Sequence, residues 1–224
     1  MVVKEKAPLQ AAFEGFIGEK GFPCTGAKAA LGKEQVYSMV AGHMACPAHD
    51  KEILAFLYDF LQTYRESGTG FHSGVILFTS PVDSTEDIFE KLMWSRLQAL
   101  ANLDAENYSY DSRVSADPFD PAFSFSLMEE ACFVIGLHPN SSRPARRFYT
   151  PALVFNPHAQ FAEFRQTNKY SMMQQSVRKR DVQFSGSVNP MLTDFGTASE
   201  AMQYSGKFYA DGLTCPLQFA HKNV

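Results

Sequence analysis

The chain has 224 residues, of which 45% are hydrophobic, so it is long enough to bury a core as one domain without a metal or disulfide to hold it together. Its formal net charge of −4 argues against nucleic acid as the main partner. The four cysteines form no CxxC pair, the amino terminus lacks a signal-peptide core, and no apolar run could span a membrane. We therefore expect a cytoplasmic, single-domain protein over residues 1–224, in which the many phenylalanines either line a large flat ligand or simply pack together.

The first half of the chain predicts several helices around one strand. Helices are expected at residues 9–19, from near Thr25, and over 51–65, where apolar residues recur at helical spacing. The run GVILFTSP (74–81) is short, β-branched and closed by proline, which indicates a buried strand. The capping pattern Ser84-Thr85-Glu86-Asp87 then begins another helix. The apolar face of that helix is formed by Phe89, Leu92, Met93, Leu97 and Leu100.

The second half predicts a hairpin, a strand and further helices. FSFSLMEEACFVIGL (123–137) alternates, turns at the acidic pair Glu129-Glu130 and continues as an apolar strand. PALVF (151–155) predicts a strand that leads into Asn156-Pro157-His158, where Asn can cap a helix and Pro can occupy its first position. A helix over 170–184 should turn Tyr170, Met173 and Val177 inward, and the helix-start pattern recurs at Asn189-Pro190. This order predicts an α+β domain with a small antiparallel or mixed sheet surrounded by helices.

The stretch LHPNSSRPARRF (137–148) places hydroxyl and guanidinium groups directly after an apolar strand. Basic residues also outnumber acidic ones between Arg143 and Arg180. Hydroxyls and forked guanidiniums bind carboxylate or phosphate oxygens well, which predicts an anion site at this loop. A solvated surface loop would have the same composition. The candidate ligands of the anion are Ser142, Arg143, Arg146 and Arg147.

Two histidines and one cysteine are further candidates. His138 and His158 each follow the expected end of an apolar strand, where scaffolds commonly present functional groups, although a single histidine is more often structural. Cys24, in GFPCTG, would lie at a helix amino terminus, which favours a thiolate nucleophile or metal ligand. A small buried apolar residue is the alternative for Cys24. The sequence contains no GxSxG, Walker, GxGxxG or HExxH motif, which argues against the chemistries those motifs carry.

Several segments together resemble the YqcI/YcgG family, in the same order and over about residues 20–216. They are FPCTGAKAAL, DPFDPAFSFSLMEEACFVIGLHPNSSRPARRF, PALVFNPHAQF, GSVNPML, EAMQYSGK and the last CP. Members with known roles resemble haem-dependent N-hydroxylases, among them those of the D-cycloserine and guanitoxin pathways. The resemblance implies a b-type haem, dioxygen or peroxide as oxidant, a possible electron donor, and a guanidino substrate such as arginine. Met202, Lys207 and Leu213 depart from the family pattern, which leaves the choice of substrate open.

The resemblance also suggests roles for the candidate residues. The loop arginines would hold the haem propionates, and one axial residue would bind iron with the opposite face open. We expect His158 to be that ligand, with His138 and Cys24 as alternatives. Glu200 would orient the substrate guanidinium through a forked hydrogen-bond pair, and His138 would relay a proton.

Two other functions are compatible with the same residues. A haem-binding sensor or carrier would use two axial ligands, such as His138 with His158. A haem-free transferase or hydrolase would use Cys24 together with a histidine. The sequence does not decide the exact substrate, the electron source or the oligomeric state.

Overall fold

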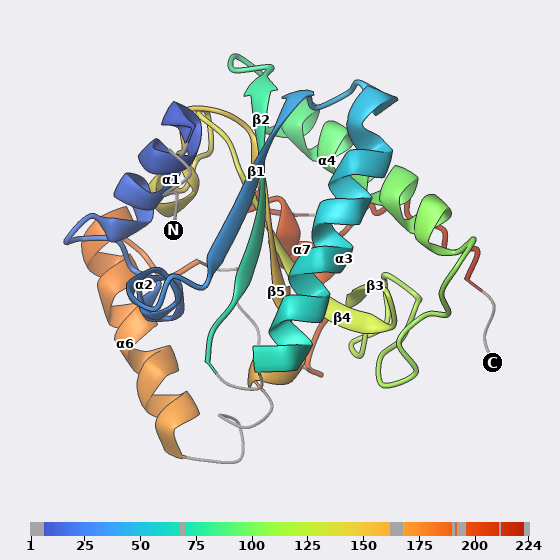
Figure 1. Ribbon diagram of the computed structural model, residues 1–224. Helices are drawn as coiled ribbons and strands as arrows, with labels where there is room; N and C mark the ends of the chain where they lie inside the picture. The colour runs from blue at the N-terminus through green and yellow to red at the C-terminus, as the bar shows by residue number, and fades with distance from the viewer. Residues whose placement is uncertain are drawn as a thin grey trace.

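The computed structural model contains a five-stranded sheet between two layers of helices (Figure 1). It describes residues 7–67, 70–161, 168–189, 191, 196–210 and 212–221, with the backbone alone for 168–170. The strands are β1 (Val36–His43), β2 (Ser73–Ser80), β3 (Phe125–Leu127), β4 (Glu130–Leu137) and β5 (Ala152–Pro157). Their order across the sheet is β1-β2-β5-β4-β3.

The helices divide between the two faces of the sheet. On one face lie α1 (Pro8–Gly18), α2 (Thr25–Gly32) and α6 (Asn168–Ser185), and on the other lie α3 (Asp50–Ser67), α4 (Glu86–Asp104) and the short α7 (Ala201–Tyr204) (Figure 1). Single 3-10 turns occur at Pro47–His49 and Pro144–Arg146. The five helices predicted at 9–19, Thr25, 51–65, Ser84–Asp87 and 170–184 are confirmed.

The sheet is mixed because its strands are joined in two different ways. β1 and β2 are parallel, and α3 makes the crossover that parallel neighbours need. The remaining pairs, β2 with β5, β5 with β4 and β4 with β3, are antiparallel. The predicted α+β class with a small mixed sheet in a single domain is therefore confirmed.

Each buried strand contributes side chains to two cores, one on either face. Val75, Leu77 and Val154 point towards α1 and α2, while Ile76, Phe78 and Leu153 point towards α3 and α4. This alternation is the two-residue period of a strand, and both faces are apolar because helices cover both. The sheet therefore separates the apolar core under α1 and α2 from the one under α3 and α4.

Local predictions failed at three places. Strand β1 was not predicted, because its residues are mostly half-buried and its sequence, VYSMVAGH, has no clear alternation. The hairpin turn is formed by Met128 and Glu129, both with positive φ, so Glu130 belongs to β4 and is buried. Asn156 and Pro157 do not start a helix.

The last correction has a simple physical basis. Asn156 and Pro157 are the final residues of β5, and Pro157 pairs with Cys132 at the end of the ladder, where a missing N–H is tolerated. The Asn156 side chain accepts a hydrogen bond from Ser73 Oγ (2.7 Å) and donates one to the Phe133 carbonyl (3.3 Å), instead of capping a helix. Helical structure begins only at residue 159.

Some expectations fall outside the described residues. The second helix start includes Pro190, and the inward direction of Tyr170 concerns a side chain that the structure does not describe. Among the helices that are described, none combines the length and hydropathy needed to cross a membrane.

Candidate functional site

A largely apolar cavity of about 290 Å³ lies between the sheet and the helices α1, α2 and α6. Strands β1, β2, β4 and β5 form its floor through residues such as Val75 and Val154, and Phe13 and Ile17 of α1 form part of its cover. Its volume is at the lower end of the range of ligand pockets. Its polar lining consists of Cys24, Ser73, Arg143, Arg146, Asn156, Gln160, Asp181 and Asn189.

The arginine loop (residues 138–147) reaches this cavity with two of its three arginines. Arg146 donates hydrogen bonds to the backbone carbonyls of Gly136 (3.0 Å), Gln203 (2.9 Å) and Tyr204 (3.0 Å). Within the described part of the chain it has no carboxylate partner. Burial, with a further contribution from the charge of Arg143, lowers the pKa of Arg146 to about 10. Arg146 is thus a half-buried cation whose direct hydrogen bonds all go to carbonyls, and the charge of nearby Asp181 compensates it only in part, so an anion that bound beside it would be stabilised.

Arg143, the second of these arginines, is already paired. Its Nη2 lies 2.6 Å from Asp181 Oδ2, and α6 supplies this carboxylate. The remaining members of the predicted anion site, Ser142 and Arg147, are exposed and do not line the cavity. Arg147 instead donates to the carbonyls of Ser141 (2.6 Å) and Ser142 (3.2 Å), which fixes the shape of the loop.

Cys24 forms the amino-terminal cap of α2 and lines the same cavity as Arg143 and Arg146. Its Sγ accepts a hydrogen bond from the Ala27 backbone N–H at 3.4 Å. Burial raises the pKa of this thiol, while the N–H groups of Ala27 and Gly26 and the charge of Arg146 oppose that rise. The free thiol of Cys24 is therefore protonated. If a metal ion bound the sulfur, the same N–H groups and the charge of Arg146 would help to stabilise the thiolate.

His158 and Glu200 do not line the cavity but contact each other. His158 Nε2 lies 3.2 Å from Glu200 Oε2, and the His158 N–H donates to the Ala131 carbonyl (2.7 Å). Glu200 Oε1 also accepts hydrogen bonds from Ser124 Oγ (2.7 Å) and Tyr204 OH (2.6 Å). Burial and the charge of Glu200 raise the pKa of Tyr204, which keeps it a donor. The carboxylate of Glu200 is therefore occupied by protein groups.

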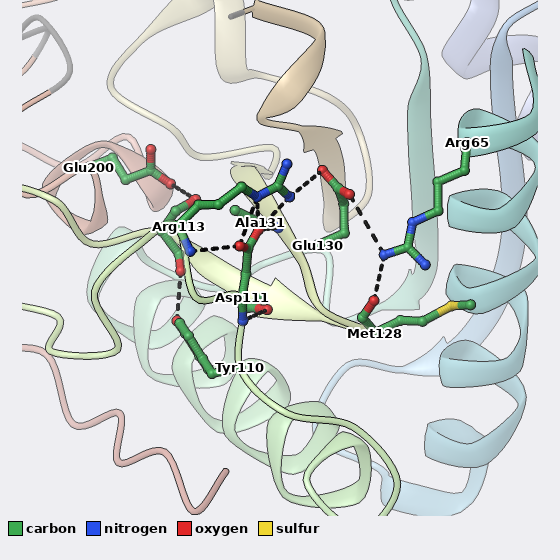
Figure 2. A network of polar contacts seen from close by, with 10 residues as sticks. Arg65, Tyr110, Asp111, Arg113, Met128, Glu130, Ala131 and Glu200 are labelled. Carbon is green, nitrogen blue, oxygen red and sulfur yellow. Dashed lines mark hydrogen bonds and ion pairs between the residues drawn. The ribbon is translucent and has the colours of Figure 1, made fainter. Parts of the chain in front are cut away.

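Figure 2 shows that Glu200 borders a larger polar network around the β3–β4 hairpin. Arg113 Nη2 contacts Asp111 Oδ2 (2.6 Å) and Glu130 Oε1 (3.1 Å), and Arg65 of α3 contacts Glu130 from the other side (3.6 Å). Asp111 also accepts a hydrogen bond from the Ala131 N–H (2.8 Å). These contacts join α3, the hairpin and the segment before it, so the network has a structural role.

His138 faces the side of the sheet opposite to the cavity. Its ring stacks on Phe89 of α4, with 4.3 Å between ring centroids, whereas its neighbour Leu137 lines the cavity. The antiparallel register pairs Leu137 with Ala152 and Cys132 with Pro157. His138 and His158 therefore lie at opposite ends of the β4–β5 pair, roughly 20 Å apart at the rise of a strand. They cannot ligate one iron together.

The structure thus brings together only part of the predicted site. Cys24, Arg143 and Arg146 share one cavity, while Ser142, Arg147, His138, His158 and Glu200 lie outside its lining. Asp181 was missed, although Met173 and Val177 were expected to point inward and the same spacing leads to Asp181. In the described ranges, no group of three or more His, Cys, Asp or Glu side chains is arranged to hold a metal ion.

Comparison with known proteins gives one result. The family model described as the YqcI/YcgG family matches residues 13–218, which is most of the chain and includes every residue of the cavity lining. No curated protein and no solved structure matches the chain.

Proposed function

The chain belongs to the YqcI/YcgG family, and we propose that it is a haem-dependent N-hydroxylase acting on a guanidino nitrogen of arginine or a related compound. The observation that carries the proposal is that Cys24 and Arg146 line the same apolar cavity. Haem needs an apolar enclosure, one axial ligand and cations for its propionates, and this donor set fits those needs. Bound haem would supply the oxygen-activating redox chemistry, with peroxide, or dioxygen and electrons, as the oxidant.

In this proposal Cys24, and not His158, would hold the iron. The Ala27 N–H donates to Sγ, and the amino terminus of α2 also favours negative charge at this position. Because burial keeps the free thiol protonated, ligation releases a proton, so haem affinity should rise with pH. His158 lies outside the lining of the cavity, with its Nε2 at Glu200.

Arg146 would bind a propionate, and the apolar residues that cover the cavity would keep water out. Arg146 is held by three carbonyls and would offer its charge to a propionate. Apolar side chains of α1 and of the sheet exclude water from the remaining surface. The cavity is smaller than a porphyrin, so haem would enter only if side chains of its cover moved outward.

The two alternative functions lack a matching arrangement. The separation of His138 from His158 removes the bis-histidine site that a carrier of that type needs. A cysteine-dependent hydrolase needs a base beside its thiol, and no histidine of the described chain lines the cavity with Cys24.

The test is an absorption spectrum of protein purified from haem-supplemented cells. Wild type should show a Soret band, and its reduced carbon monoxide complex should show the red-shifted band of thiolate ligation. Cys24→Ser should lose that signature, whereas Cys46→Ser, which changes an exposed cysteine, and His158→Gln should keep it. Mass spectrometry should then detect N-hydroxyarginine after addition of arginine and oxidant.

Different results would refute different parts of the proposal. Wild-type protein without a Soret band after hemin addition would exclude the haem. Loss of haem in His158→Gln but not in Cys24→Ser would exclude Cys24 as ligand. Haem-loaded protein that oxidises no guanidine would exclude the substrate.

A further inference from the structure

Asp181 is the one carboxylate in the described lining of the cavity. It lies on α6, is 6% exposed, and shares the lining with the cations Arg143 and Arg146. A cationic ligand group that enters this cavity therefore has a single acidic partner. Glu200, the carboxylate expected from the sequence to orient a guanidinium, is outside the lining and occupied by other groups.

Asp181 already binds a guanidinium, which is that of Arg143. Arg143 Nη2 donates to Asp181 Oδ2 at 2.6 Å. Two further donors fix the carboxylate: Ser185 Oγ bonds Oδ1 (2.9 Å) and the Asn189 N–H bonds Oδ2 (3.2 Å). A carboxylate whose plane is fixed in this way presents a preorganised receptor for a planar cation.

The contact made by Arg143 is replaceable. It uses one nitrogen, although a guanidinium can form a forked pair with both oxygens of a carboxylate. The other contacts of this guanidinium are to Ser187, at the carbonyl (2.8 Å) and Oγ (3.2 Å), and Ser187 is exposed. Arg143 can therefore leave Asp181 for solvent without crossing the core.

Exchange of Arg143 for a substrate guanidinium would conserve the charges that face Asp181 in the cavity. A substrate guanidinium on Asp181 keeps that carboxylate neutralised, while Arg143 moves into water. The exchange thus leaves no buried acid unpaired, which would otherwise be strongly destabilising.

We propose that Asp181 receives the guanidinium of the substrate, and that Arg143 occupies this position until the substrate displaces it. The identity of the ligand as a guanidino compound rests on the proposed function, but the form of the receptor rests on the Arg143–Asp181 pair itself. Arg143 is therefore an internal competitor that sets the threshold concentration for binding.

The experiment measures binding of L-arginine to the haem-loaded protein by calorimetry, with L-citrulline as the uncharged analogue. Wild type should bind arginine and not citrulline. Asp181→Asn should weaken arginine binding by about tenfold or more, and Arg143→Gln should tighten it by about threefold or more. The matched control is Arg180→Gln, which removes a guanidinium beside Asp181 in sequence but outside the lining, and it should leave affinity unchanged.

The outcomes separate this inference from the proposed function. Equal affinity of wild type and Asp181→Asn, or weaker binding by Arg143→Gln, overturns the role of Asp181 while leaving the haem and the substrate in place. Failure of haem-loaded wild type to bind arginine or any guanidine overturns both. If Asp181→Asn does not fold, the comparison of Arg143→Gln with Arg180→Gln decides.

Discussion

The buried ring of His138 illustrates how a single residue can tie stability to pH. The residue is fully buried against Phe89, and among the described residues neither of its ring nitrogens has a hydrogen-bond partner. Burial lowers the pKa of His138, the charge of Arg146 lowers it further, and Glu86 opposes both. The neutral imidazole is therefore the form that the folded protein holds.

This arrangement predicts a loss of stability in mild acid. In the unfolded chain the histidine has a pKa of about 6.5, and in the folded protein its pKa is lower. The contribution of His138 to stability is therefore complete above about pH 6.5 and is lost as the pH falls below that value. The free energy of unfolding should decrease by at most about 1.4 kcal/mol per pH unit. His138→Leu should flatten the fall in the free energy of unfolding measured by urea denaturation between about pH 7.5 and pH 5.5. His43→Leu, which removes an exposed imidazole, serves as the control and should keep the wild-type slope. An unchanged slope in His138→Leu would refute the assignment.

Among the elements, the β3–β4 hairpin contains unusual backbone strain. Its two turn residues, Met128 and Glu129, have φ of 53° and 58°, a region in which residues other than glycine and asparagine are disfavoured. The turn persists because the strands on either side are held by ladder bonds and by the network around Glu130. The hairpin therefore depends on tertiary contacts more than on its turn sequence.

Glu129→Gly should consequently stabilise the protein. Glu129 is exposed, and glycine adopts positive φ without the cost of about 1 kcal/mol that a Cβ imposes. Thermal unfolding followed by circular dichroism should show a higher midpoint. Glu129→Ala removes the same carboxylate but keeps the Cβ, so it should not be more stable than wild type. A lower midpoint for the glycine variant than for the alanine variant would contradict the argument.

The elements that could be predicted from the sequence are those with a strong local signal. Helix α4 follows from its capping pattern, since Thr85 Oγ1 does accept the Ile88 N–H (3.3 Å), and β2 follows from its uninterrupted apolar run. Strand β1 has no such signal, because an edge strand is half-buried. Asn156-Pro157 has a helix-start pattern, but pairing with β4 determines its structure.

For the site, residue types were predictable and their grouping was not. Cys24, Arg143 and Arg146 stood out as chemical groups, and the cavity does bring them together. The histidines looked equivalent because each ends a strand, but the antiparallel register of β4 and β5 separates them. Register and pairing are long-range properties that local patterns do not contain.

In the whole molecule, the buried carboxylate of Asp104 joins distant parts of the chain. It accepts hydrogen bonds from Tyr58 OH of α3 (2.6 Å) and the Met128 N–H of the hairpin (3.0 Å), and it contacts His221 Nε2 near the carboxyl terminus (2.9 Å). Asp104 itself ends α4 and is fully buried. Four segments therefore share one acidic group.

Asp104→Asn should lower the free energy of unfolding by about 3 kcal/mol, because a charged acceptor is lost and buried donors are left poorly paired. Urea denaturation followed by circular dichroism measures the change. Asp59→Asn, on the exposed side of α3, should be within about 0.5 kcal/mol of wild type. A similarly small effect for Asp104→Asn would show that these contacts are not coupled.

The three carbonyls that Arg146 binds come from β4 and from the residues that close α7, so this side chain fastens segments that are far apart in sequence. Substitution of Arg146 would break these contacts, whatever compound the cavity binds. Changes in specificity would be tolerated better at neighbours that do not connect segments in this way, beginning with Arg143, whose contacts other than Asp181 are to the exposed Ser187.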